Sequence, residues 1–226
     1  MNRTLPLLLL TGTCLMYAAE KDSDAERLGR AAEVFQEVMS APDKGIPQDL
    51  LDKSACVVVV PGVKKAAFVV GAKFGRGFFS CRAQGGTGWG APGAVRVEGG
   101  SFGFQIGASE TDVIMLVMNQ HGADRLISSR FTLGGDASVA AGPVGRTATA
   151  ETDAYMTAEI LTYSRARGLF AGLSLSGATM RQDLDTNRAL YGKTLQNREI
   201  IRTGIAPPPA AKDFLSTLSK YSSRKG

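Results

Sequence analysis

The chain has 226 residues, of which 27 are glycine and 44% are hydrophobic, and its formal net charge is +5. This length suits one large domain or a domain with tails, and the apolar content suffices for a substantial core. His121 is the only histidine, so neither a zinc site nor a Ser-His-Asp or Cys-His hydrolase is expected. We therefore expect no metal, no cofactor and no enzyme activity.

The basic groups are concentrated in two parts of the chain. Residues 54–110 carry six basic and two acidic side chains, and residues 181–226 carry nine and four, whereas residues 20–53 carry five and nine. Local positive fields of this kind attract phosphate-bearing surfaces. Nucleic acid is not the expected partner, because the basic segments lack interleaved aromatic stacking positions.

Residues 1–19 have the pattern of an export signal. Arg3 is followed by an apolar run from Leu5 to Tyr17, which is too short for a convincing membrane span, and cleavage is expected after Ala19. A lipid anchor at Cys14 is the less favoured alternative, because the residues before it fit a lipobox badly. We expect an exported chain, periplasmic or associated with the envelope.

Two cysteines, Cys56 and Cys81, remain after such a cleavage. An exported protein is able to oxidise them to a disulfide. Two small buried hydrophobic residues are an equally good interpretation, and the sequence leaves both open.

Apolar periodicity predicts the elements of the first half in chain order. An amphipathic helix is expected over Asp24–Ser40, and a short helix that begins at Pro47 continues to Lys53. Three strands follow, with a turn at Pro61-Gly62 between the first two: Ala55–Val60, Ala66–Phe74 and Gly77–Ala83. A hairpin comes next, formed by Ser101–Ala108 and Asp112–Met118 with its bend at residues 109–111.

The second half reads as shorter elements separated by glycine. These are a short helix Gly122–Ser128, a thin strand and tight turn within Phe131–Arg146, a hairpin of Ala154–Tyr163 and Leu169–Thr179, a helix Asp185–Tyr191 capped by Asp185, and a terminal helix Ala211–Tyr221. The sum is an antiparallel α+β fold, with a strongly bent or barrel-like sheet and short helices at its ends. The expected divisions are a signal at 1–19, a helix at 20–45, a domain at 46–192 and a basic tail at 193–226.

Four blocks carry a family resemblance: IPQDLLDKSACVVVVPGVKKAAFVVGAKFGRG (46–77), SFGFQIGASETDVIMLVMN (101–119), FTLGGDASVAAGPVGR (131–146) and YSRARGLFAGLSLSGATMRQDLDTNRALYG (163–192). Together they resemble the SYLF lipid-binding domain family, which occurs in exported bacterial proteins and in eukaryotic membrane- and actin-associated proteins. The resemblance implies binding of acidic phospholipids without catalysis. One difference stands out: the helix at Asp24–Ser40 is net acidic, whereas membrane-surface helices usually have a basic polar face. We expect this helix to pack on the domain.

The first candidate lipid site lies on the early strands. Lys64 and Lys65 follow the expected turn at Pro61-Gly62, and Lys73 and Arg76 bracket the next one. Each basic group near an anionic surface contributes about 1 kcal/mol, so electrostatics alone is weak and an apolar insertion or a phosphate pocket is needed as well. The adjacent Phe78 and Phe79 are the expected insertion; a solvated basic face with a buried aromatic pair is the competing interpretation.

A second candidate contact repeats the pattern of arginine, glycine and an apolar pair. Arg165 and Arg167 flank a bend that ends in Gly168, and Leu169 and Phe170 follow. Two ordinary turns whose apolar pairs enter the core are the competing interpretation. Trp89, in a glycine-rich loop, is either an interfacial anchor or the plug of a small core.

We expect a peripheral binder of anionic phospholipid headgroups. The alternative is a periplasmic protein-interaction or envelope-scaffolding module, which would use strand edges to bind an envelope protein.

Overall fold

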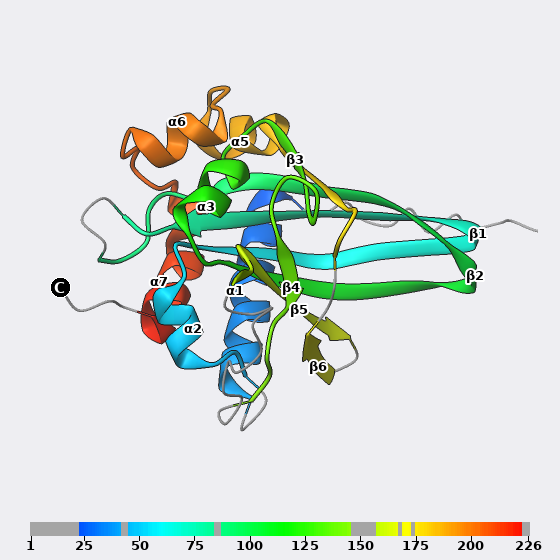
Figure 1. Ribbon diagram of the computed structural model, residues 1–226. Coiled ribbons are helices and arrows are strands. Elements are labelled where there is room, and N and C mark those ends of the chain that lie inside the picture. The colour runs from blue at the N-terminus through cyan, green and yellow to red at the C-terminus, as the bar shows by residue number, and fades with distance from the viewer. Residues whose placement is uncertain are drawn as a thin grey trace, which may run out of the picture.

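The structure is a computed structural model that describes residues 23–41, 45–83, 87–145, 157–166, 169–172 and 175–222, with the backbone alone described at 66–71, 101–108 and 170–172. Two long strands, β1 (Cys56–Cys81) and β2 (Gly93–Val117), dominate it (Figure 1). The other elements are α1 (Asp24–Ser40), α2 (Gln48–Lys53), α3 (Gln120–Leu126), β3 (Arg130–Thr132), β4 (Val139–Ala141), β5 (Ile160–Ala166), β6 (Leu169–Gly172), β7 (Thr179–Gln182), α5 (Leu184–Tyr191), α6 (Asn197–Arg202), the 3₁₀ turn η1 (Pro209–Ala211) and α7 (Lys212–Tyr221).

The strands form one sheet in the order β3-β7-β2-β5-β4, with β1 also paired to β2 and β6 to β5. The first part of β2 pairs with β7, and its last part pairs with β5. All pairs are antiparallel except β4 with β5. The expected α+β class, with a mostly antiparallel and strongly curled sheet, is confirmed.

The β1–β2 ribbon doubles back on itself. A disulfide joins Cys56 to Cys81, the two ends of β1. Nearer the middle, a Cβ added to Gly75 would lie 2.8 Å from the side chains of Val60 and Val63. The outgoing and returning limbs of β1 therefore lie against each other, and glycine on the returning limb permits the close approach. Figure 1 shows the ribbon reaching out from the helices to a distal bend and returning.

The prediction of three separate early strands is wrong. Pro61-Gly62 makes a bulge within β1, because the pairing register shifts between Val60 and Val63 while the ladder continues on both sides. Gly62 has a φ of 59° there, and its N–H donates to Asp112 Oδ1 at 2.9 Å. A turn signal in the sequence does not distinguish a bulge from a chain reversal.

The predicted hairpin bend at residues 109–111 is also wrong. These residues lie inside β2, where Ser109 pairs with Lys65 and Glu110 with Lys64. The expected hairpin around Gly168 exists as β5 and β6, whose Arg165 pairs with Phe170. Its second arm ends at Gly172, and β7 pairs with β2 and β3.

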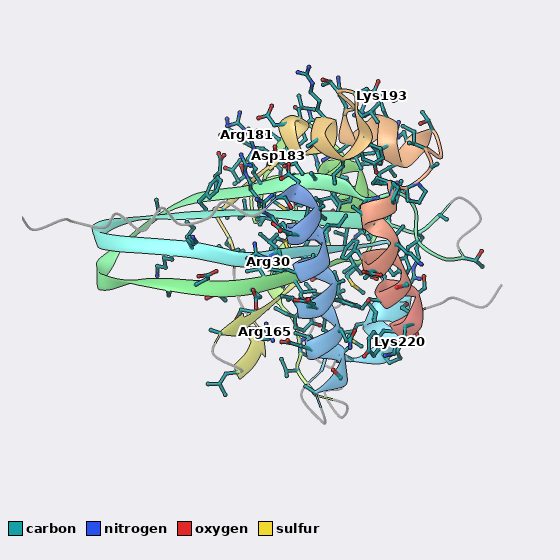
Figure 2. All side chains as sticks on the ribbon, turned by 180° about the vertical axis from the view of Figure 1, so that it is seen from behind. Arg30, Arg165, Arg181, Asp183, Lys193 and Lys220 are labelled. Carbon is teal, nitrogen blue, oxygen red and sulfur yellow. A yellow bond between two sulfur atoms is a disulfide. The ribbon has the colours of Figure 1, made fainter. Side chains whose placement is uncertain are left out.

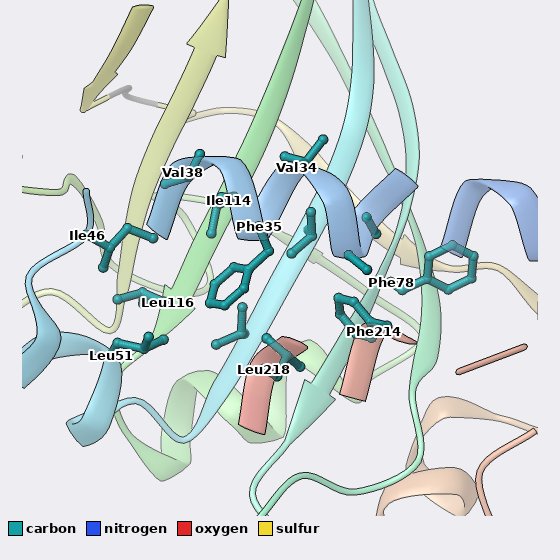
Figure 3. Packing of buried hydrophobic residues seen from close by; sticks show 14 of the residues in the cluster. Val34, Phe35, Val38, Ile46, Leu51, Phe78, Ile114, Leu116, Phe214 and Leu218 are labelled. Atoms are coloured by element: carbon teal, nitrogen blue, oxygen red, sulfur yellow. The ribbon is translucent and has the colours of Figure 1, made fainter. Parts of the chain in front are cut away.

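The sheet is buried on both of its faces near the helices. Val57 and Val59 lie in a core with α1 and α7, whereas Val58 and Val60 lie in a second core on the opposite face. Both faces of the CVVVV run are thus covered, which explains why it is uninterrupted by polar residues. Figure 3 shows the first core, in which Phe35 of α1 packs near Leu218 of α7.

Helix α1 has the predicted bounds, and its position agrees with the expected packing on the domain. Ser23 caps it in a capping box with Glu26, and Phe35 is fully buried. The C-terminal segment, expected as a basic tail, contributes the buried Phe214 and Leu218 to the same core. In the described part of the chain, no helix is long and apolar enough to cross a membrane.

The predicted cap of the helix at Asp185 is wrong by two residues. Asp183 is the N-cap of α5, and its carboxylate accepts from Thr186 N–H at 3.3 Å. The Asp183 side chain is only 1% exposed. This buried carboxylate lies within ion-pair distance of two arginines of the sheet, Arg76 and Arg96.

Candidate functional site

The fold separates the predicted lipid-binding residues into different environments. Three lysines lie on the projecting part of the β1–β2 ribbon, one arginine reaches a buried carboxylate, and two phenylalanines lie in the core.

Lys64 and Lys65 lie on the outgoing limb of β1, and Lys73 lies on the returning limb. The contacts that join Cys56 to Cys81 and Val63 to Gly75 set the two limbs in register. By continuation, Lys64 and Lys73 lie at about the same distance from the bend. We call Lys64, Lys65 and Lys73 the lysine collar.

The chain beyond the lysine collar contains no charged residue: neither residues 66–72 of β1 nor residues 99–109 of β2 include Asp, Glu, Lys or Arg. Glu110, directly opposite Lys64, is the first carboxylate on the way back to the body. Lys64 is exposed and Lys73 is half-buried. Phe74, next to Lys73, is 46% exposed; it and Leu169 are the two exposed large apolar side chains in the part of the chain whose side chains the structure describes. The distal ribbon, residues 64–74 and 99–109, thus combines positive charge with uncharged chain.

Arg76 lies in a different environment, where its Nε is 3.4 Å from Asp183 Oδ2. Arg96, directly opposite Arg76 in the ladder, also reaches Asp183, at 3.5 Å from Oδ1. Because Asp183 is buried, these two arginines hold a carboxylate that would otherwise be costly to bury. Arg76 therefore has a structural partner and does not belong to the lysine collar.

The expected insertion of Phe78 and Phe79 into lipid is contradicted. Both side chains are 0% exposed. Phe78 lies in the core under α1 and α7, and Phe79 lies in the core on the opposite face of the sheet. Two consecutive strand residues point to opposite faces, and here both faces are covered, so this pair stabilises the fold.

Arg165 joins β5 to the body of the molecule (Figure 2). Its Nε and Nη2 donate to Asp112 Oδ2 at 3.0 and 2.8 Å, and its Nη1 pairs with Glu37 of α1. Burial raises the pKa of the Asp112 carboxyl, and the hydrogen bond from Gly62 N–H opposes that rise. These ion pairs give Arg165 a role in attaching α1 to the sheet.

The other residues of this second candidate contact, Arg167, Leu169 and Phe170, are described to different extents. Arg167 lies outside the described residues, and of Phe170 only the backbone is described. Leu169 is 71% exposed, so it does not enter the core.

Trp89 is the plug of a core. It is 8% exposed, and its Nε1 donates to the Ser222 carbonyl at 3.1 Å. The Arg82 guanidinium stacks over its ring at 3.9 Å and also donates to Leu51 and Ser222. A basic residue of the early strands thus holds Ser222, directly after α7 (Lys212–Tyr221), against the sheet.

Sequence reasoning missed three arginines that the sheet brings beside Arg76. They are Arg96, Arg181 and Arg130, which pair in succession across β2, β7 and β3. They are far apart in the chain, and no local pattern connects them. Only the pairing register, which one sequence does not give, would have found them.

The described part of the chain is therefore an α+β domain in which three lysines lie on a projecting ribbon and four arginines form a row across the sheet. Residues 98–221 match the family model described as Ysc84, Las17-binding protein actin regulator. The chain belongs to this family, which is the SYLF family expected from its sequence blocks.

Named relatives agree with this assignment. The chain is 31% identical over 205 residues to SH3 domain-containing YSC84-like protein 1 of Rattus norvegicus and 33% identical over 207 residues to that of Xenopus laevis. These alignments cover 89% of the chain and 60% and 61% of those relatives. It is also 33% identical over 180 residues to LAS seventeen-binding protein 3 of Saccharomyces cerevisiae, covering 78% of the chain and 39% of that relative. The chain thus spans at most about three fifths of these proteins. The name of the yeast relative describes a binding protein.

Proposed function

We propose that this chain binds peripherally to membranes rich in anionic phospholipids, without catalysis, and that the distal ribbon is the contact. The observation that carries the proposal is the lysine collar around an uncharged end of the ribbon. Figure 1 shows that this end projects away from all the labelled helices, so it is able to meet a flat surface.

The expected strength of binding requires both parts of the distal ribbon. Three lysines near an anionic surface contribute about 3 kcal/mol, which alone corresponds to a dissociation constant weaker than about 1 mM. The exposed Phe74, next to Lys73, supplies the additional apolar contact with the interfacial region of the bilayer. This replaces Phe78 and Phe79 as the source of that contact.

The Cys56–Cys81 disulfide supports a place of action outside the reducing cytoplasm. It agrees with the proposed export of the chain by the signal at residues 1–19. We propose a location in the periplasm or at the envelope.

Co-sedimentation with vesicles tests the function. We compare phosphatidylglycerol with phosphatidylcholine vesicles at low salt, using the native chain and the Lys64→Gln/Lys65→Gln/Lys73→Gln variant. The native chain pellets with the anionic vesicles only, and the variant loses about 100-fold in affinity with an unchanged melting temperature. The matched control Lys193→Gln/Arg198→Gln/Lys212→Gln, which removes three exposed charges elsewhere, retains binding. Equal pelleting of all three proteins would refute the proposal.

A protein partner is the second candidate. It is favoured by the name of the yeast relative, LAS seventeen-binding protein 3. Retention of one envelope protein by the immobilised chain, in lipid-free detergent extract and insensitive to salt, would support it.

A further inference from the structure

Four arginines stand side by side on one face of the sheet. Each lies directly opposite the next in the order Arg76, Arg96, Arg181, Arg130. Directly opposed residues share a face, and neighbouring strands are about 4.8 Å apart. The row therefore crosses β1, β2, β7 and β3 over about 14 Å.

The inner end of the row is partly neutralised from within the fold. Asp183 is shared by Arg76 and Arg96, at 3.4 and 3.5 Å. The exposed Asp185 lies 3.8 Å from Arg96. The inner arginines thus hold α5 against the sheet, as the position of Asp183 near the start of that helix illustrates (Figure 2).

The outer end has fewer acidic partners. The Arg181 side chain is 53% exposed, and its Nη1 is 3.5 Å from Glu98 Oε2. Arg130 is exposed, and among the described residues no carboxylate pairs with it. Like charges directly opposite each other on neighbouring strands are destabilising, so this end of the row gains from an added anion.

Hydroxyl groups accompany these two guanidinium groups. Thr132 lies directly opposite Thr179, two residues along β3 and β7 from the arginines and therefore on the same face. Two carboxylates lie beside these groups. Asp136 accepts from Thr132 N–H at 2.7 Å, and Glu98 lies directly opposite Thr179 on β2. The outer end thus offers two guanidinium and two hydroxyl groups as donors, bordered on the β2 side by Glu98.

We propose that Arg130 and Arg181, with Thr132 and Thr179 beside them, form a binding site for a phosphate-bearing anion. The planar fork of a guanidinium matches the oxygens of phosphate and donates two parallel hydrogen bonds. Two such forks, carried by residues whose strands are about 5 Å apart, suit a dianion or a pyrophosphate-like group. None of its four residues belongs to the lysine collar, so the site does not depend on the membrane contact proposed above.

Titration calorimetry with inorganic pyrophosphate at low salt tests the site. The native chain binds the probe, and Arg130→Gln/Arg181→Gln weakens binding by about tenfold or more, as expected for two lost charge-assisted contacts. The control Lys193→Gln/Arg198→Gln removes the same charge from exposed positions elsewhere and leaves affinity unchanged. Equal affinity of both double variants overturns the proposal, as does tighter binding of citrate than of pyrophosphate by the native chain.

Vesicle binding identifies the source of the phosphate. If the phosphate belongs to a lipid headgroup, the Arg130→Gln/Arg181→Gln variant loses binding to phosphatidylglycerol vesicles as well as to pyrophosphate. If the ligand is soluble, this variant loses binding to pyrophosphate alone. The Lys64→Gln/Lys65→Gln/Lys73→Gln variant retains pyrophosphate in either case. Loss of pyrophosphate binding in that variant, at the same level as in the arginine variant, would attribute binding to net charge and overturn the site.

Discussion

The distal ribbon and the base of the same two strands use positive charge in opposite ways. At the base, arginines pair with carboxylates from other elements: Arg76 with Asp183 and Arg165 with Asp112. On the distal ribbon, residues 64–74 and 99–109 contain lysines and no carboxylate, and the nearest carboxylates along β2 are Glu110, opposite Lys64, and Glu98, opposite Phe74. A basic stretch of sequence thus holds arginines that assemble the fold beside lysines that we propose contact a membrane.

Residue type follows the same division. Arginine supplies a planar fork for fixed ion pairs, whereas lysine is a strongly hydrated point charge on a flexible stem. Within β1, the base has Arg76 and the distal part has Lys64, Lys65 and Lys73.

The largest expected effect on stability is a difference between two phenylalanines on the same face of β1. Phe78→Ala removes a fully buried ring and is expected to lower the free energy of unfolding by about 4 kcal/mol. Phe74→Ala, at a residue that is 46% exposed, is expected to cost less than about 1 kcal/mol. Urea unfolding followed by circular dichroism measures both. A small effect at Phe78 would contradict the position of its ring in the core.

Removal of the disulfide tests the closed end of β1. Cys56→Ser/Cys81→Ser is expected to lower the free energy of unfolding by about 3 kcal/mol, because the bond closes a loop of 25 residues. The measurement is urea unfolding of the variant against the native chain, with and without reductant. Reductant should lower the stability of the native chain and leave the variant unchanged. An equal response of both proteins would contradict the bond.

Substitution of two aspartates compares a buried with an exposed partner of the arginine row. Asp183→Asn removes the carboxylate shared by Arg76 and Arg96 and is expected to cost about 2–3 kcal/mol of stability. Asp185→Asn, at a side chain that is 84% exposed, should change stability by less than about 0.5 kcal/mol. Thermal and urea unfolding give both values. Equal costs would show that Asp183 is not the residue that attaches α5 to the sheet.

The smallest effect concerns one lysine of the distal ribbon. Lys64→Gln is expected to weaken binding to phosphatidylglycerol vesicles by about fivefold, or about 1 kcal/mol, without a change in melting temperature. Lys212→Gln on α7 serves as the exposed control. Co-sedimentation at two salt concentrations measures both, and equal weakening by the two variants would argue against a local contact.

Local signals in the sequence were sufficient for part of the fold. The capping residues and apolar spacing of Asp24–Ser40 determine α1, and they are local. The strand breaks were predicted wrongly, because Pro61-Gly62 is a signal for a turn and a bulge alike. Whether the chain reverses there depends on the partner strand β2, which lies about 50 residues away.

The candidate site was also predictable only in part, because some of its residues have local signals in the sequence and others do not. Lysines without nearby acidic residues are visible in the sequence, and Lys64, Lys65 and Lys73 remain the best candidates. Phe78 was misassigned because an apolar residue beside a glycine looks the same whether helices α1 and α7 cover it or not. The row that includes Arg130 and Arg181 depends on strand pairing over about 50 residues and has no local signal.

Hydrogen–deuterium exchange of the native chain, with and without phosphatidylglycerol vesicles, tests the central claim most directly. Our account predicts that vesicles protect peptides covering residues 64–74 and 99–109, while peptides covering α1 and residues 76–81 exchange as before. Protection of α1 with no change on the distal ribbon would contradict it.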